Sequence, residues 1–166
     1  LDLSESGLKE TPNRVAAMYV KEIFSGLNPS NKPQITLFEN KYHYSEIIVE
    51  KNITLHSYCE HYFIPFTAKA HIAYICKGKT IGSGQLNKLL QYHSRKPQSK
   101  EMLIEEIALS VKDCLASQDV AVIIEAFHCC GTPSAINTGN NSTVTAHFSG
   151  KFQNEDTKRE FFSYLK

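Results

Sequence analysis

The feature that most constrains the fold of this chain is an almost continuous apolar run from Val120 to Ala126. A run of this length, bounded by polar segments, is typical of a buried strand. The segment from Ala68 to Ile75 shows a second strand pattern, because Ala70, Ile72 and Tyr74 recur at every other position. The chain is therefore expected to form a sheet that contains a buried strand.

Helical periodicity occurs before, between and after these strands. Thr11-Pro12 provides an N-cap followed by proline at the first helical position, and Gly26 ends the helix predicted over 11–26. Leucines on one face predict a helix over Gln85–His93, and another follows the Pro97 break, from 102 to 115. The remaining predictions are strands at 47–49, 53–55 and 144–152, a hairpin turn at 77–79, loops at 28–33 and 131–142, and a terminal helix from Thr157.

The order of these elements is helix, strands, two helices, strands and helix, which defines an α+β domain. Its sheet is expected to be antiparallel, with the helices segregated to one face. The 166 residues are enough for one domain but short of two, and no linker or repeat divides them. We therefore predict a single domain over 1–166, with its core from about residue 34 to residue 166.

Composition narrows the class of function. A formal net charge of +1 provides no broad basic surface for nucleic acid. No apolar run approaches the roughly 20 residues that span a bilayer, and no export signal stands at the start, so no membrane partner is expected. The five cysteines are an odd number, which argues against a disulfide framework and predicts reduced thiols in a cytoplasmic protein.

Two segments combine thiol and imidazole groups, the donor types that zinc favours. One contains Cys59 and His61, and the other contains His128, Cys129 and Cys130. Each adjoins the end of a predicted strand, so the fold must bring them together for a single site to form. Two thiolates and one imidazole would leave a position for water, and the other histidines could then move protons. The competing interpretation is that each cysteine is a small buried hydrophobe.

The same segments resemble the GTP cyclohydrolase I family. Cys59-Glu60-His61, followed by an aromatic residue and Phe63, is similar to the Cys-Glu-His-His-Phe signature of that family. The resemblance continues in order through TPNRVA (11–16), MYV (18–20), EIFSGL (22–27), IG (81–82), LNK (86–88), KPQ (96–98), Glu101, AFHCC (126–130), STVT (142–145), Gly150 and Phe152. It covers nearly the whole chain, which is therefore identified as a member of this family.

The resemblance implies a tunnelling fold (T-fold) that closes into an oligomeric β-barrel, as a homodecamer of two face-to-face pentamers with sites between subunits. It implies an enzyme that opens the guanine imidazole ring of GTP, releases formate and forms 7,8-dihydroneopterin triphosphate for pterin or folate synthesis. It also implies residue roles: zinc ligands Cys59 and Cys130, proton donor His128, assisting histidine His61, and Glu101 on the guanine edge. A carboxylate suits guanine because N1–H and the 2-amino group donate in parallel.

The sequence departs from the family signature at Tyr62, where the family has a histidine as its third zinc ligand. A neutral phenol is a weak zinc ligand. Three outcomes therefore remain open. Tyr62, Cys129 or His61 completes the site, or zinc is bound weakly or in an altered form, or zinc is absent.

The residues expected to bind the triphosphate differ as well. Ala17, Gln85 and Ser134 occupy positions where the family has cations, whereas Arg14 and Lys88 are retained. Each charge-assisted hydrogen bond contributes roughly 1.5–3 kcal/mol, so three losses weaken triphosphate binding by several powers of ten. Besides GTP turnover, two functions therefore stay open: a diverged enzyme acting on a purine or pterin without a triphosphate, and a non-catalytic binding or regulatory paralogue.

Overall fold

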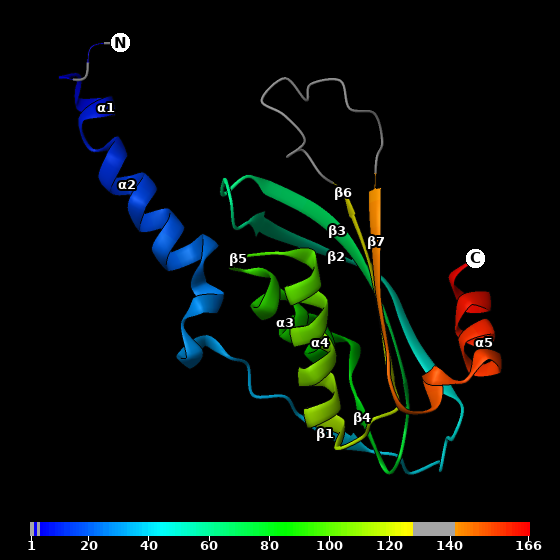
Figure 1. Ribbon diagram of the computed structural model, residues 1–166. Coiled ribbons are helices and arrows are strands. Elements are labelled where there is room, and N and C mark those ends of the chain that lie inside the picture. Colours follow the sequence, from blue (N-terminus) through cyan, green and yellow to red (C-terminus); the bar gives the residue numbers. More distant parts are fainter. Residues whose placement is uncertain (1, 3, 128–141) are drawn as a thin grey trace.

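The computed structural model describes residues 2, 4–127 and 142–166 of the chain (Figure 1). Its helices are α1 (Ser6–Lys9), α2 (Thr11–Met18), α3 (Ser83–Ser94), α4 (Lys100–Leu115) and α5 (Glu155–Leu165). Its strands are β1 (Leu37–Glu39), β2 (Ile47–Cys59), β3 (Pro65–Ile75), β4 (Lys79–Ile81), β5 (Pro97–Gln98), β6 (Val120–Phe127) and β7 (Ser142–Phe148). The π-helical turn η1 (Tyr19–Ile23) and the 3₁₀ turns η2 (Ser25–Leu27), η3 (Pro29–Asn31) and η5 (Gly150–Gln153) connect them.

The main sheet has five strands in the order β5-β2-β3-β6-β7. The pairs β2–β3, β3–β6 and β6–β7 are antiparallel, whereas the short β5 lies parallel to β2. Strands β1 and β4 form a separate two-stranded sheet. The α+β class is therefore as the sequence predicts, and the sheet is antiparallel as predicted except at β5.

Strand β6 is the buried strand that its apolar run predicts. Val122 and Ile124 belong to the apolar cluster that includes α3 and α4, whereas Ala121 and Ile123 belong to a second cluster. Successive side chains of a strand point to opposite faces, so the two clusters lie on opposite faces of the sheet. Because both faces of β6 are covered, its sequence is almost continuously apolar.

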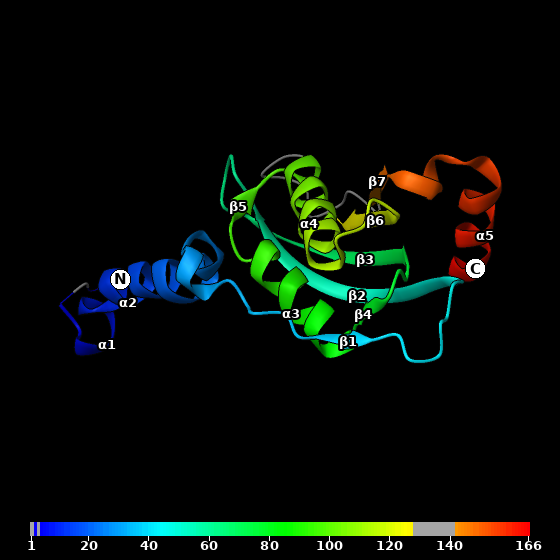
Figure 2. The ribbon, with the colours of Figure 1, turned by 90° about the horizontal axis from the view of Figure 1, so that it is seen from below.

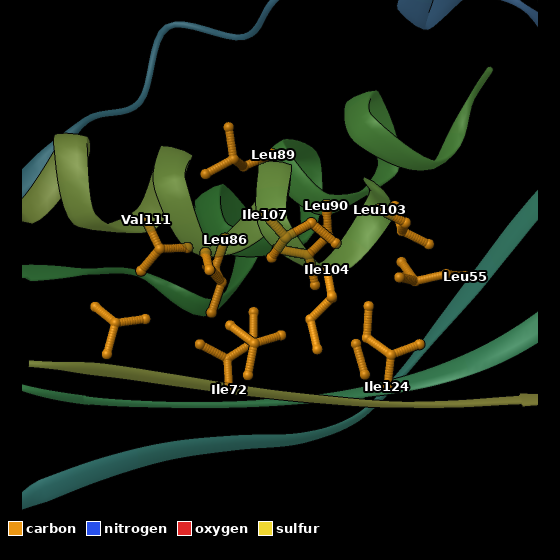
Figure 3. Close-up of a cluster of buried hydrophobic side chains, with 14 of the residues drawn as sticks. Leu55, Ile72, Leu86, Leu89, Leu90, Leu103, Ile104, Ile107, Val111 and Ile124 are labelled. Carbon is orange, nitrogen blue, oxygen red and sulfur yellow. The ribbon is translucent and has the colours of Figure 1, made fainter. Parts of the chain in front are cut away.

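The larger core lies between the sheet and helices α3 and α4 (Figures 2 and 3). Leu86, Leu89 and Leu90 of α3 lie on one helical face and are fully buried, as their spacing predicts. In Figure 3 they lie with Ile107 of α4 over the sheet, where Ile72 points toward them. Full burial of one such side chain contributes about 1.5–3 kcal/mol, so this layer holds both helices on the sheet.

Helix α5 corrects the expectation that all helices cover one face of the sheet. Phe161 of α5 and Phe152 of η5 are fully buried, with ring centroids 6.0 Å apart. They pack with Ile75 and Ile123 on the face opposite to α3 and α4. Both faces of the sheet are apolar here, so the second face also needs a cover, and the terminal helix provides it (Figure 1).

The hairpin expected around residues 77–79 is also wrong in its pairing. Gly78 turns the chain at φ 102°, but the following strand β4 pairs with β1, with Thr80 opposite Phe38. Strand β3 cannot accept β4 because it pairs with β2 along one edge and with β6 along the other. The hydroxyl of Tyr74 instead fixes β4 to β3, since it accepts a hydrogen bond from Ile81 N at 3.3 Å.

Two further strand predictions change in extent. The runs at 47–49 and 53–55 form one strand, β2, whose register shifts between Glu50 and Ile53, where Asn52 has φ 62°. The last strand, predicted over 144–152, ends at Phe148 and continues as η5. Gly150 has φ 56° at that point, a conformation that favours glycine and turns the chain away from the sheet.

The N-terminal helix begins at Thr11, which is its first helical residue rather than the predicted N-cap. Glu10 is the N-cap, Thr11 is the first helical residue, and the Thr11 hydroxyl donates back to Gly7 O at 3.3 Å. After α2 the chain continues through the π-helical turn rather than as one α-helix to Gly26. The helix α2 and the turn η1 together form an N-terminal arm, residues 11–23. This arm stands away from the sheet in both ribbon views (Figures 1 and 2), and Met18 on it is 38% exposed.

Candidate active site

The first predicted site segment forms the turn between β2 and β3. Cys59 N donates to Ile64 O at 2.9 Å, and Phe63 N donates to Cys59 O at 2.8 Å. Phe63 has φ 53°, which is costly for a bulky residue and needs support from its surroundings. The turn is thus closed by backbone hydrogen bonds at the residue expected to bind metal.

An aromatic cluster of Tyr19, Phe24, Tyr58 and Phe63 supplies that support. The Phe24 ring lies 5.2 Å from Phe63 and 5.7 Å from Tyr58, and Tyr19 lies 6.3 Å from Tyr58. Edge-to-face contacts of this kind contribute about 0.5–1.5 kcal/mol each beyond burial. The cluster therefore attaches the end of the N-terminal arm to the turn, a link that the sequence reasoning missed because Tyr19, Phe24 and Phe63 belong to separate motifs whose contact no local pattern predicts.

Cys59 and His61 are brought together by this turn. The Sγ atom of Cys59 lies 3.6 Å from Nδ1 of His61, and Cys59 is half-buried while His61 is exposed. Tyr62 is 71% exposed, and its ring centroid lies 6.3 Å from that of His61. The turn therefore presents a thiol and an imidazole as neighbours, with the phenol in contact with solvent.

Glu101 is connected to the same end of β2 through β5. Pro97 and Gln98 pair in parallel with Tyr58 and Cys59. The side chain of Ser99 then caps α4, accepting a hydrogen bond from Met102 N at 3.1 Å. Glu101 follows in the first turn of α4, where the helix dipole favours a carboxylate, and it is exposed to solvent.

The second predicted site segment begins where β6 ends. His128, Cys129, Cys130 and Ser134 lie outside the described residues. The last residue of β6, Phe127, pairs with Thr67, and Pro65 on the same strand β3 pairs with Tyr58. The C-terminal end of β6 therefore lies at the same end of the sheet as Cys59. Among the described residues, no three His, Cys, Asp or Glu side chains gather as a possible metal site.

The predicted phosphate residues are dispersed along α2 and α3. Lys88 of α3 lines an open groove of about 1040 Å³ between α3, β2 and the N-terminal arm. Arg14 on α2 does not line it, and its guanidinium donates to Gly7 O and, at 3.2 Å, to Thr11 Oγ1. Gln85 is half-buried, and its Oε1 has no hydrogen-bond partner among the described residues.

Two further cations in the groove were missed by the sequence reasoning. Lys21 and Arg95 line it together with Lys88, and the acidic Glu22 also belongs to its wall. None of the three cations forms an ion pair within the described part of the chain. Lys21 lies on η1 and Arg95 follows α3, so they share one wall only in the folded chain.

The geometry defines an α+β domain with a thiol–imidazole pair at one end of its sheet and a cation-lined groove beside it. The sequence pattern of GTP cyclohydrolase I matches residues 1–166. The chain is 45% identical over 166 residues to GTP cyclohydrolase 1 of Flavobacterium johnsoniae, covering all of this chain and 74% of that protein. It is 41% identical over 167 residues to GTP cyclohydrolase 1 of Aeromonas salmonicida, covering all of this chain and 77% of that protein.

A match of this extent assigns the family. The chain belongs to the GTP cyclohydrolase I family of hydrolases. Within the described ranges, no helix has the length and apolar character needed to cross a membrane.

Proposed function

We propose that this chain catalyses the hydrolytic opening of the guanine imidazole ring of GTP, giving formate and 7,8-dihydroneopterin triphosphate. Family membership over residues 1–166 supports the reaction class. The observation that carries the proposal is the contact at 3.6 Å between Cys59 Sγ and His61 Nδ1, at the end of β2. In this proposal the thiol serves as a metal ligand, and the imidazole beside it serves as a proton-transfer group.

The described donors fit zinc as part of its ligand set. A thiol and an imidazole are both ligand types that zinc accepts, and Cys59 is half-buried at a closed turn. In this proposal Cys59 and Cys130 bind the metal, and Tyr62, Cys129 or His61 provides the third ligand. Zinc, when bound, supplies the Lewis acidity that makes water a usable nucleophile near neutral pH.

The other residues bind the substrate and move protons. Glu101 accepts from guanine N1–H and the 2-amino group, two parallel donors that match the two oxygens of a carboxylate. His128 donates a proton to the purine, and His61 assists it. Hydrogen-bond donors and acceptors held by closed turns and helix caps need little rearrangement during the reaction, which favours catalysis.

The phosphate end of the substrate is the part most altered in this chain. Lys88 is retained and lines the groove, Arg14 is retained on α2, and Gln85 and Ser134 remain as polar contacts where the family has cations. A remodelled phosphate end also supports a second function, an enzyme that acts on a purine or pterin without a triphosphate. A binding or regulatory paralogue without turnover is the third.

The same proposal includes assembly into a homo-oligomer. The expected assembly is a decamer whose sheets close into a β-barrel. Strand β7 pairs with β6, and its other edge has no strand partner among the described residues. The arm exposes Val15, Met18 and Val20 at 42%, 38% and 71%. Free strand edges and exposed apolar side chains are usual where subunits meet. A single domain over 1–166 and a cytoplasmic location complete the proposal.

The test is turnover by the purified protein. The protein is incubated with zinc and GTP, and formate release and the fluorescence of oxidised pterin are followed. Turnover of GTP supports the proposal and excludes the two alternatives. Absence of turnover, together with tight binding of guanosine or a pterin that lacks phosphates, overturns it in favour of the two alternatives.

A further inference from the structure

A polar network lies between α3 and α4, outside the residues assigned to the reaction, with His93 and Ser110 buried and Glu106 half-buried. His93 Nδ1 lies 3.1 Å from Glu106 Oε2, and His93 Nε2 lies 2.8 Å from Ser110 Oγ. The ammonium group of Lys96 also contacts Glu106 Oε2. His93 is 6% exposed and Ser110 is 7% exposed, so the histidine has both ring nitrogens engaged inside the core.

The order serine, histidine and carboxylate is that of a hydrolytic triad, but burial excludes this use. A nucleophilic hydroxyl needs access to a substrate carbonyl. Ser110 lies on the buried side of α4, beside Ile107 and Val111, which are fully buried. The network therefore does not attack a substrate, and its role is to hold parts of the protein in position.

The network continues into the segment that joins α3 to α4. The side-chain amide of Gln98 donates to His93 O at 2.7 Å and to Ser57 Oγ at 3.1 Å. Ser57 Oγ donates to Lys96 O at 3.3 Å. Ser57 and Gln98 are both almost fully buried. Glu106 thus contacts the side chains of His93 and Lys96, and the backbone carbonyls of the same two residues accept hydrogen bonds from Gln98 and from Ser57 of β2, two residues before Cys59.

Gln98 adjoins two segments of the proposed active site, the end of β2 and the start of α4. Gln98 pairs with Cys59 in the sheet, and Glu101 lies three residues further on, after the Ser99 cap. We propose that Glu106, with His93, Lys96 and Ser110, forms a positioning network that sets the end of β2 at Cys59 and the start of α4 at Glu101. The inference rests on the proposed function for the roles of these two residues.

The charge on Glu106 strengthens the hydrogen bonds of the network. Burial favours the neutral acid, but hydrogen bonds from Lys96 and His93 outweigh this and lower the pKa of the Glu106 carboxyl. A carboxylate that accepts from two cationic or polarised donors forms bonds roughly twice as strong as neutral ones. Breaking such a partly buried charged network by removing one partner leaves the other groups without their hydrogen bonds, so the geometry that they set should change.

The experiment compares Glu106→Gln and Ser110→Ala with Glu105→Gln. Glu105, its neighbour on α4, is exposed and pairs with His147 at 2.9 Å, so its variant removes one charge from the same helix outside the network. Each variant is titrated with Co²⁺, whose thiolate absorption band reports the geometry at Cys59, and is assayed with GTP for kcat and KM. Thermal unfolding identifies the temperature range in which each variant is folded.

In the folded range, Glu106→Gln is expected to weaken Co²⁺ binding about ten-fold and to lower kcat about ten-fold. Ser110→Ala keeps the carboxylate and is expected to change both about three-fold, while Glu105→Gln matches the wild type. If Glu106→Gln and Ser110→Ala lower the unfolding temperature but leave Co²⁺ affinity and kcat unchanged, the network is only structural and the inference is overturned. A wild-type protein that binds Co²⁺ but does not turn over GTP contradicts the proposed function instead, and the Co²⁺ titration still tests the network.

Discussion

The Sγ atom of Cys59 lies 3.6 Å from Nδ1 of His61, within a turn whose next residue, Tyr62, is 71% exposed. The turn thus holds two zinc-type donors together and leaves the phenol in solvent. A neutral phenol is a weak zinc ligand. A histidine in its place would add a third donor of the right type on the same turn.

Tyr62→His is therefore expected to raise zinc affinity by at least ten-fold, because ligand type and number control the affinity of a zinc site. The measurement is competition for zinc against a chelating dye, with metal content of the purified protein as a second reading. Tyr62→Phe is the matched control and should bind zinc as the wild type does. Equal affinity in Tyr62→His and the wild type would show that position 62 does not reach the metal.

Lys88→Ala is expected to raise KM for GTP about ten-fold, since one charge-assisted hydrogen bond to phosphate contributes roughly 1.5–3 kcal/mol and exposure reduces that value. Binding of guanosine, which has no phosphate, should not change. Lys41→Ala, an exposed lysine outside the groove, serves as the control. A variant that loses guanosine and GTP binding equally would place Lys88 away from the phosphates.

Local patterns predicted the parts of the fold that depend on local spacing. The buried β6 and the leucine face of α3 followed from apolar periodicity, and Cys59 and His61 meet because they lie two residues apart. The pairing of β4 with β1 and the position of α5 did not follow. They depend on which strand edges are already occupied and which sheet face remains uncovered, and no local window contains that information.

The residues of the candidate site also divide into those that local patterns predicted and those that only the fold brings together. Tyr58 and Phe24, which hold the turn, and Lys21 and Arg95, which line the groove with Lys88, are far apart in sequence. Phe24 lies in a motif of the family resemblance, but no local pattern indicates which residues any of the four would contact. Only the folded chain brings these side chains together, so motif reasoning found the chemical groups and missed the groups that support them.

Leu90→Ala is expected to destabilise the protein by about 2–5 kcal/mol, because Leu90 is fully buried between α3 and α4 and its loss leaves a cavity. Met102→Ala on α4 is the comparison, since Met102 is 51% exposed and its loss should stay within roughly 0.5 kcal/mol. Urea unfolding followed by circular dichroism measures both. Similar losses in the two variants would contradict the assignment of the core to this layer.

The stability of the protein should fall when the pH drops below the ordinary pKa of histidine, and His93 is one cause. Burial lowers the pKa of the His93 imidazole, although Glu106 beside it acts in the opposite direction and Lys96 adds to the lowering. The unfolded chain therefore takes up a proton near pH 6.5, whereas the folded chain takes it up only at lower pH. Acidification through pH 6.5 thus favours the unfolded state. The pKa of the Glu106 carboxyl is lowered in the folded protein. Its contribution to the free energy of unfolding is therefore lost only when the pH falls below 4.5, its ordinary pKa.

The variant His93→Phe separates this contribution from the others. Burial also lowers the pKa of the His71 imidazole, so the wild type and the variant both lose stability on acidification, but the variant should lose less between about pH 7 and about pH 5. His43→Asn is the control, because His43 is exposed with φ 50°, a conformation that asparagine adopts readily. The urea midpoint of each protein at the two pH values provides the measurement. A fall as steep in His93→Phe as in the wild type would mean that the pKa of His93 does not differ between the folded and unfolded chains, and a steeper fall in the variant would mean that the contact with Glu106 is an ion pair that stabilises the protonated imidazole.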